Sequence, residues 1–167
     1  MYDIIAIGNA SLDIFLTIKK ANLACQKDKC LLCLPYGAKI PAQEYTVSVG
    51  GNAANTAVAF SRLGLKTGIL TILGQDETSL KIIDKLNKEK VATALIKKQP
   101  GLRANSSIIL DIEGQRDRTI LSYHFPKKFE IAKIPQTKWL YLTSIGHQFS
   151  RVWRDLRRQM DRCGPAV

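Results

Sequence analysis

The 167-residue sequence has no apolar run approaching the roughly 18–20 residues needed to cross a bilayer, so we do not expect an integral membrane protein. The apolar N-terminal stretch has no basic region before it and contains Asp3 and Asp13, which predicts a buried strand of a cytoplasmic chain rather than a secretory signal. Internal repeats and low-complexity segments are lacking. The length suits one domain or a piece of a larger one, and 46% hydrophobic residues exclude wholesale disorder.

Acidic residues are scarce, since 14 Asp and Glu stand against 25 Lys and Arg, and the formal net charge is +11. A basic balance can serve nucleic acid, an anionic membrane surface or phosphorylated ligands. However, the lysines are scattered, and no compact basic stripe with interleaved aromatic residues is present. We therefore interpret the charge as a solvated, lysine-rich surface and do not expect a nucleic-acid partner.

The four cysteines lack the paired spacings of a zinc site. Cys25, Cys30 and Cys33 form C-x4-C-x2-C, whereas Cys163 lies far away and no fourth ligand is near the trio. We expect no metal site and treat these residues as reduced intracellular thiols. Their role does not follow from the sequence.

Strands and helices alternate along much of the chain. Apolar runs predict buried strands in four places, at 3–8, 66–73, 91–97 and 139–144. Helices are predicted at 50–64, from Asp76 to Lys90 and from Phe149 to Met160. This alternation favours an α/β fold with a parallel sheet and right-handed crossovers.

Two segments do not follow the alternation. The region 14–49 contains strand-like pieces at 14–18, 31–34 and 44–49, and the runs 104–112 and 118–124 flank a polar EGQRD turn as a hairpin. We expect these segments to form a small separate β-sheet that covers the ends of the main strands. The predicted architecture is therefore a parallel-sheet α/β body with a small β-sheet lid.

Asp13 follows the first predicted strand, five residues after Gly8. Open α/β sheets bind ligands at the carboxyl ends of their strands, so Asp13 is placed near such a crevice. Its carboxylate can accept hydrogen bonds from two hydroxyl groups, as recognition of a polyol requires. A capping or turn aspartate is the alternative that this residue alone leaves open.

The first predicted helix opens with the sequence GGNAAN, residues 50–55. Paired glycines let the backbone approach a ligand closely. Asn52 and Asn55 share a face of the first turn, and their amides suit neutral hydroxyls better than phosphates. The segment has neither the G-x-G-x-x-G spacing of a dinucleotide site nor the Gly-Lys pair of a Walker loop. A helix start that packs tightly through small residues remains the alternative.

The stretch SVGGNAANTAVAFSRLGLKTGILTILGQDE closely resembles the N-terminal signature of ribokinase-like (PfkB) carbohydrate kinases. DIIAIGNASLD is similar to the first strand of that family with its substrate aspartate, and EGQRDRTILSYH is similar to its lid hairpin. Residues 1 to about 145 match the N-terminal part of such an enzyme in order and spacing. Where many ribose-type members have an acid, Ser144 and its neighbours supply none, so another sugar or a nucleoside is an equally open acceptor.

The resemblance implies roles for individual residues. Asp13 would bind sugar hydroxyls, Gly51, Asn52 and Asn55 would line the same pocket, and Gly50 would give access to the backbone. Ser11 lies where several family members have a polar residue and joins this predicted substrate-binding set. Two copies could also pair through their lids as a homodimer.

The resemblance further implies that residues 1–167 are the N-terminal, sugar-binding portion of an ATP-dependent kinase. The complete enzyme would use ATP and Mg²⁺ to transfer the γ-phosphate to a hydroxyl of a sugar or nucleoside. The family's D-T-x-G-A-G-D-like segment, which supplies the catalytic base, does not occur in these residues, and neither does the nucleotide-binding portion beyond it. We therefore expect no catalytic residue, no tight cofactor binding and no turnover from this chain alone. A non-catalytic sugar-binding or interaction module derived from such a kinase is the alternative.

Overall fold

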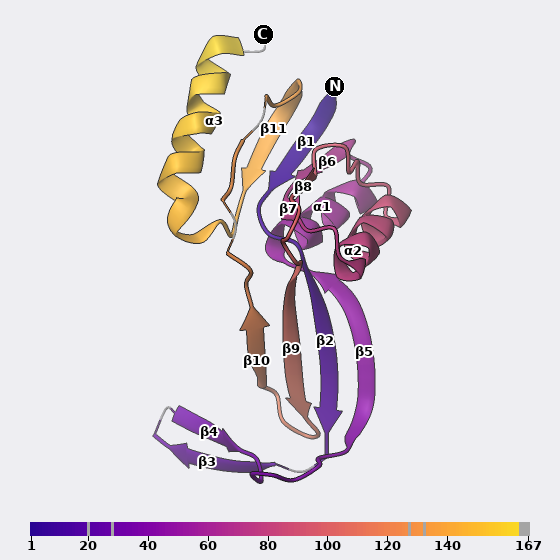
Figure 1. Ribbon diagram of the computed structural model, residues 1–167, viewed down its shortest axis with the longest axis vertical. Helices are drawn as coiled ribbons and strands as arrows, with labels where there is room; N and C mark the ends of the chain where they lie inside the picture. The colour runs from indigo at the N-terminus through magenta and orange to yellow at the C-terminus, as the bar shows by residue number, and fades with distance from the viewer. Residues whose placement is uncertain (20, 28, 127, 132, 164–167) are drawn as a thin grey trace.

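The computed structural model describes the chain apart from residues 20, 28, 127, 132 and 164–167. An α/β body forms one end, and a second β-sheet extends away from it at the other end (Figure 1). We call this second sheet the lid. The arrangement confirms the predicted parallel-sheet body with a small β-sheet lid.

The body is built on a three-stranded parallel sheet in the order β11-β1-β6. These strands are β1 (Tyr2–Ile7), β6 (Thr67–Leu70) and β11 (Thr137–Leu142). The helices are α1 (Asn52–Arg62), α2 (Glu77–Lys88) and α3 (Phe149–Cys163), the last preceded by a 3-10 turn, η1 (Gly146–Gln148). Because β1 is the central strand, its carboxyl end lies between those of its two neighbours.

Helices cover both faces of this sheet. On one face, Ala6 and Ile69 pack with small residues of α1 and with Ile82 and Leu86 of α2. On the other face, Ile5 and Ile7 pack with Val152 and Leu156 of α3, as well as with Phe129. Burial on both faces explains the continuous apolar runs of β1 and β6, whereas Trp139 and Tyr141 of the edge strand β11 remain exposed.

The lid is a four-stranded sheet in the order β10-β9-β2-β5. Its strands are β2 (Ser11–Ile18), β5 (Ala42–Gly50), β9 (Asn105–Ile112) and β10 (Arg118–Tyr123). The predicted hairpin is confirmed, since β9 and β10 pair antiparallel with Arg118 opposite Asp111. β2 pairs antiparallel with β5 and parallel with β9, so it occupies an inner position of the lid.

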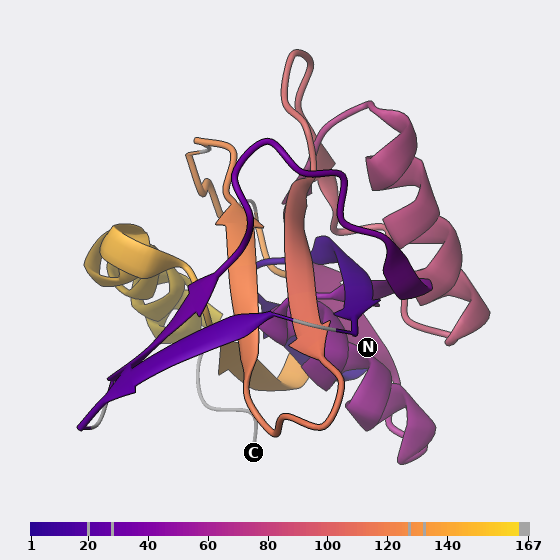
Figure 2. The same ribbon diagram turned by 90° about the horizontal axis from the view of Figure 1, so that it is seen from below.

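A second hairpin, which the sequence did not predict as such, projects from the outer end of the lid (Figures 1 and 2). It consists of β3 (Asn22–Gln26) and β4 (Lys29–Cys33). Cys25 and Cys30 are direct cross-strand partners and form a disulfide, so the expectation of reduced thiols was wrong for this pair. Cys33 is a free, exposed thiol.

The strand predictions at 66–73 and 91–97 need correction. The first is broken at Thr71 into β6 and a short β7 (Ile72–Leu73), because β1 ends at Ile7 and offers no partner beyond Leu70. β7 pairs instead with a two-residue β8 (Lys97–Lys98). Within 91–97, only Ala92 bridges to the main sheet, opposite Gly68, and residues 94 and 95 form a turn in which the amide of Ile96 donates to the carbonyl of Thr93 at 3.0 Å.

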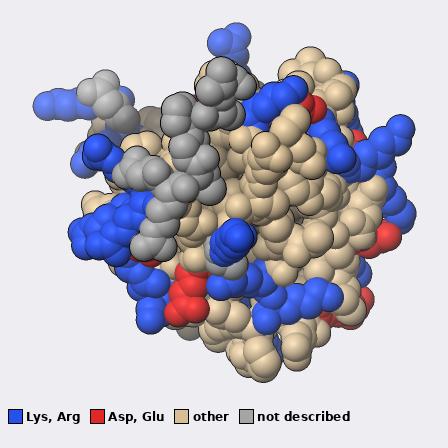
Figure 3. Space-filling view, turned by 90° about the horizontal axis from the view of Figure 1, so that it is seen from above, with Lys and Arg blue, Asp and Glu red and all other residues tan. Residues whose placement is uncertain are grey.

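Among the residues that the structure describes, no helix is both long and apolar enough to span a membrane. Figure 3 shows one end of the molecule, where Lys and Arg side chains are distributed around the rim and only a few acidic side chains lie between them. On α3, the exposed basic residues are Arg151, Arg154, Arg157 and Arg158.

Candidate functional site

The loops that follow β1 and β11 meet at the carboxyl end of the sheet. The side-chain amide of Asn9 donates to the carbonyl of Ser144 at 2.6 Å, and that of Asn52 donates to the hydroxyl of Ser144 at 2.5 Å. Ser144 has a φ of 48°, in the left-handed region, which turns the chain sharply after β11. The start of α1 is thereby tied to both loops. The polar side chains of Asn9, Asn52 and Ser144 therefore gather at the edge where parallel α/β sheets bind ligands, and we refer to this edge as the cleft.

Ser11 and Asp13 open the first lid strand on this same edge. Their side chains lie on one face of β2, and the Ser11 hydroxyl donates to Oδ1 of Asp13 at 3.0 Å. Across the sheet, Ser11 pairs with Gly50 and Asp13 pairs with Ser48. A Cβ atom at position 50 would lie 1.8 Å from Oδ2 of Asp13, so any other residue there would displace the carboxylate from this position.

Gly51 shapes the start of α1. Its φ of 88° is accessible to glycine and strained for other residues. A Cβ atom there would lie 2.6 Å from the carbonyl oxygen of Asn9 and 2.8 Å from Cα of Ala10. No side chain caps α1; instead the Asn9 carbonyl accepts the amide of Ala53 at 3.1 Å. Close backbone approach, as predicted for the paired glycines, is therefore used to lock the β1 loop against the helix.

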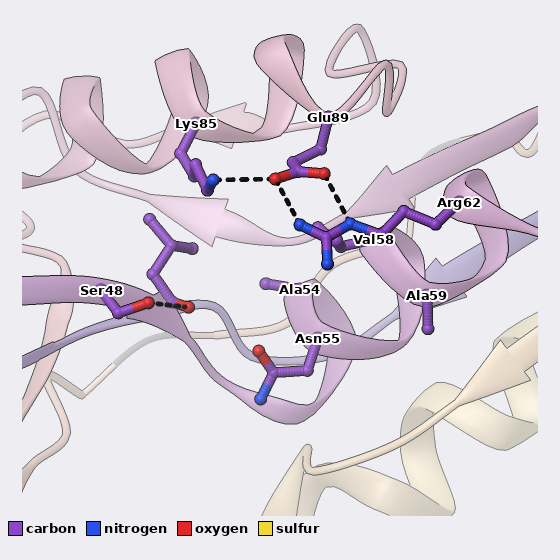
Figure 4. A pocket seen from close by; sticks show the side chains of 9 residues that line it. Ser48, Ala54, Asn55, Val58, Ala59, Arg62, Lys85 and Glu89 are labelled. Carbon is purple, nitrogen blue, oxygen red and sulfur yellow. Dashed lines mark hydrogen bonds and ion pairs between the residues drawn. The ribbon is translucent and has the colours of Figure 1, made fainter.

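The predicted substrate-binding residues do not all converge. Ser11, Asp13, Gly50 and Gly51 lie together at the junction of body and lid. Asn52 is exposed and bonded to Ser144, on the side of the cleft formed by β11. The side chain of Asn55 lines a neighbouring pocket between α1 and α2 (Figure 4).

The sequence did not predict Asn9 as a site residue. For Ser144, the sequence indicated only that no acidic residue stands at this position. The position of Asn9, directly after the glycine that ends the first strand, was the available signal for it. Asn105, which is 1% exposed and pairs in register with Ser11, was not predicted either. The Asn105 side chain accepts the amide of Phe125 at 3.2 Å, while its Nδ2 has no hydrogen-bond partner among the described residues.

The neighbouring pocket has a volume of about 420 Å³. An ion cluster forms one wall: Glu89 accepts from Nε and Nη2 of Arg62 at 2.8 and 2.7 Å and from Nζ of Lys85 at 2.8 Å. These hydrogen bonds, that of Arg62 first, lower the pKa of Glu89 from 4.5 to about 2. The complete lining is Ser48, Val49, Ala54, Asn55, Val58, Ala59, Arg62, Lys85 and Glu89.

Among the residues that the structure describes, no three His, Cys, Asp or Glu side chains are grouped so that they could hold a metal ion. The polar groups of the cleft are hydroxyls, amides and one carboxylate, a set that can exchange hydrogen bonds with hydroxyl groups.

The chain is similar in sequence and in structure to known proteins. It is 34% identical to the fructosamine kinase FrlD of Bacillus subtilis (strain 168) over 67 residues, which are 40% of this chain and 24% of that protein. Among solved structures, the ribokinase of Cryptococcus neoformans var. grubii serotype A in complex with ADP superposes with a TM-score of 0.71 at 15% identity, covering 97% of this chain and 47% of that one. The fructokinase of Halothermothrix orenii gives a TM-score of 0.69 at 21% identity, covering 94% of this chain and 54% of that one.

At these identities the solved structures establish the ribokinase-like fold alone. The aligned part of the chain spans about half the length of each of them and about a quarter of the curated relative. Residues 10–148 of this chain match the family described as pfkB family carbohydrate kinase. This range includes Asp13, the Gly50-Gly51 pair and Ser144. The match covers most of the chain, and the chain therefore belongs to the PfkB family of carbohydrate kinases.

Proposed function

We propose that this chain is the acceptor-binding portion of an ATP-dependent kinase that phosphorylates a hydroxyl group of a sugar or nucleoside. One observation carries the proposal: Asp13 is held by the Ser11 hydroxyl, in a position from which a side chain at residue 50 would displace it, beside the carboxyl end of β1. A family match over residues 10–148 supports phosphoryl transfer as the reaction class of the whole enzyme.

The chain's own residues would bind and orient the acceptor. Asp13 can accept two hydroxyl hydrogen bonds, and the bond from Ser11 fixes the orientation of the carboxylate. Asn52 and Ser144, which are hydrogen-bonded to each other on the body side, would donate to or accept from further hydroxyls of the acceptor. Holding the acceptor in one geometry is the larger part of what a protein contributes to phosphoryl transfer.

ATP and Mg²⁺ are assigned to the complete enzyme. The described residues contain no cluster of metal ligands, and the GGNAAN segment that begins α1 has no lysine to cradle phosphates. We therefore expect this chain to bind the acceptor, without tight binding of nucleotide and without phosphoryl transfer. The alternative is a non-catalytic sugar-binding module, which would bind the acceptor in the same way but would take no part in phosphoryl transfer.

The test is acceptor binding to the 167-residue chain, measured by calorimetry with ribose, fructose, fructosamine and adenosine. Fructosamine is included because the curated relative is named a fructosamine kinase. Asp13→Asn should weaken binding of the preferred acceptor about 10- to 100-fold, because a hydrogen bond to a charged group contributes about 1.5–3 kcal/mol.

The matched control is Asp111→Asn, which changes the same residue type on the same face of the lid at its outer end. This variant should bind as the unmodified chain does. Equal affinity in the Asp13 and unmodified chains, or equal losses in both variants, would contradict the role of Asp13.

We also propose that two copies pair through the lid. The face of the lid opposite to Asp13 is apolar, and several of its side chains are exposed, among them Tyr45, Val47, Ile108, Leu121 and Tyr123. In a chain with a net charge of +11, this uncharged face is a surface on which two copies can meet with little repulsion. Leu121→Lys should shift a sedimenting dimer to monomer, whereas Ile120→Lys, which points to the other face, should not. A monomer at all concentrations would refute the proposal.

A further inference from the structure

The pocket between α1, α2 and the end of β5 lies beside the proposed acceptor cleft. Unlike the cleft, it is lined by positively charged side chains. Figure 4 shows Lys85, Glu89 and Arg62 along one side and Asn55 on the opposite side. The two cations and one anion give this wall a formal charge of +1. The pocket therefore favours an anion over a cation.

Both carboxylate oxygens of Glu89 already accept hydrogen bonds from the protein, so Glu89 does not serve as an acceptor for a ligand. Its Oε1 already accepts from Arg62 and Lys85, and its Oε2 accepts from Nε of Arg62. Its side chain is 14% exposed, and its pKa of about 2 keeps it ionised at neutral pH. Its role is to hold the two cations in place.

The cations retain donors that Glu89 does not use. Arg62 contacts Glu89 through Nε and Nη2, and Figure 4 shows its third nitrogen, Nη1, directed away from Glu89 toward the side on which Ala54 lies. The ammonium of Lys85 has three N–H groups, of which the bond to Glu89 occupies one. A carboxylate that enters the pocket can therefore accept hydrogen bonds from both side chains.

The remaining walls define the rest of the ligand. Ala54, Val58 and Ala59 of α1 supply apolar surface, while Ser48 and Asn55 contribute polar groups. We propose that this pocket binds a small carboxylate with a short apolar stem. The carboxylate is held by Arg62 and Lys85, and the stem lies on α1.

The pocket shares residues with the acceptor cleft. Asn55 belongs to the predicted substrate-binding set, and Ser48 is the cross-strand partner of Asp13. The carboxylate can thus come from two sources: a substituent carried by the acceptor itself, or a separate small molecule. The first source rests on the proposed function, whereas binding of a free carboxylate does not.

Free carboxylates test the site directly. Acetate, butyrate and hexanoate are titrated into the 167-residue chain and followed by NMR, with butyramide as the neutral counterpart of butyrate. Affinity should rise up to about fourfold per added methylene until the pocket is full, which corresponds to about 0.8 kcal/mol per buried CH₂. Butyramide should bind at least tenfold more weakly than butyrate. Equal binding of butyrate and butyramide would overturn the proposal.

Variants identify the donors. Lys85→Gln should weaken butyrate binding about fivefold or more, and it leaves the Arg62–Glu89 pair intact. Arg62→Gln should weaken butyrate binding more than Lys85→Gln does. The matched control is Lys81→Gln, one turn earlier on α2, where the lysine pairs with Glu77 and does not line the pocket. Unchanged butyrate affinity in the Lys85 and Arg62 variants, with native NMR spectra, would equally overturn the site.

A last comparison distinguishes the sources. Fructose and fructose carrying a glycine substituent at C-1 are compared in the unmodified and Lys85→Gln chains. Tighter binding of the conjugate, lost in the variant, supports the site and assigns the carboxylate to the acceptor. Butyrate binding without any gain for the conjugate supports the site and assigns it to a separate small molecule. If butyrate binds while no sugar or nucleoside does, the pocket stands and the proposed acceptor function fails.

Discussion

Replacing Gly51 by alanine tests whether close backbone contact builds the cleft. The φ and ψ at this position are 88° and 138°, in a sparsely populated region that costs an alanine about 1–3 kcal/mol of backbone strain. The new Cβ atom would also lie 2.6 Å from the Asn9 carbonyl oxygen and 2.8 Å from Cα of Ala10, both backbone atoms. Overpacking of this kind adds about 1–3 kcal/mol. The expected loss is therefore about 2–6 kcal/mol of unfolding free energy.

Gly64→Ala is the matched control. Gly64 has nearly the same φ, 87°, but a Cβ atom there would have no heavy atom within 4 Å. Because the substitution also reduces the entropy of the unfolded chain, its net cost should be only about 1 kcal/mol. The difference between the two variants therefore reports what Gly51 requires beyond a positive φ, chiefly the contact of its Cβ atom with the Asn9 loop.

Gly50→Ala completes the series, since the three heavy atoms nearest to its Cβ atom would all belong to the carboxyl group of Asp13. A flexible side chain can rotate away, so stability should change by less than about 1 kcal/mol, whereas acceptor binding should be lost. Urea unfolding gives the free energies and calorimetry the binding. A Gly51 variant within about 0.5 kcal/mol of the Gly64 variant would refute the reasoning, whereas failure of the Gly51 variant alone to remain soluble would support it.

Three further changes have defined expectations. Asp76→Ala should cost about 1–2 kcal/mol in urea unfolding, because Asp76 caps α2 through the amide of Ser79; an unchanged midpoint would contradict this. Glu89, whose pKa falls from 4.5 to about 2 on folding, contributes stability above pH 4.5 that is lost as the pH falls toward 2. Glu89→Gln should weaken the dependence of the melting temperature on pH over that range. An unaltered dependence on pH would contradict the lowered pKa of Glu89. Reduction of Cys25–Cys30 should accelerate tryptic cleavage within its hairpin and leave the melting temperature unchanged, since the hairpin projects away from the body. A lower melting temperature would show that the hairpin supports the body.

The sequence could predict those elements whose pattern arises from burial. Strand β1 is buried on both faces and reads as an apolar run, and Asp76 has the residue type and position of a helix cap, which its bond to the Ser79 amide confirms. β3 gave no such signal because all five of its residues are exposed and its pairing with β4 buries little. The disulfide also escaped prediction, since it depends on the register that places Cys25 opposite Cys30.

The missing parts of the site depend on distant contacts. Asn52 and Ser144 are 92 residues apart, and Asn9 and Ser144 are 135 apart. No local pattern brings them together. They meet because β1 and β11 are parallel neighbours, whose carboxyl ends lie at the same edge. Likewise, the break at Thr71 follows from where β1 ends, which the apolar run at 66–73 does not reveal.

The position of these residues relative to the two sheets bears on how an acceptor would be held. Asp13 belongs to a lid strand, whereas Ser144 follows a body strand and Asn52 begins a body helix. Ser11 and Gly50 pair at the point where both lid strands join the body, so the cleft straddles this junction. A hydroxylated ligand that bonds to Asp13 on one side and to Asn52 or Ser144 on the other therefore links lid to body. Its binding free energy then includes the cost of fixing the lid, and the preferred acceptor is the one whose hydroxyl groups span both sides at once.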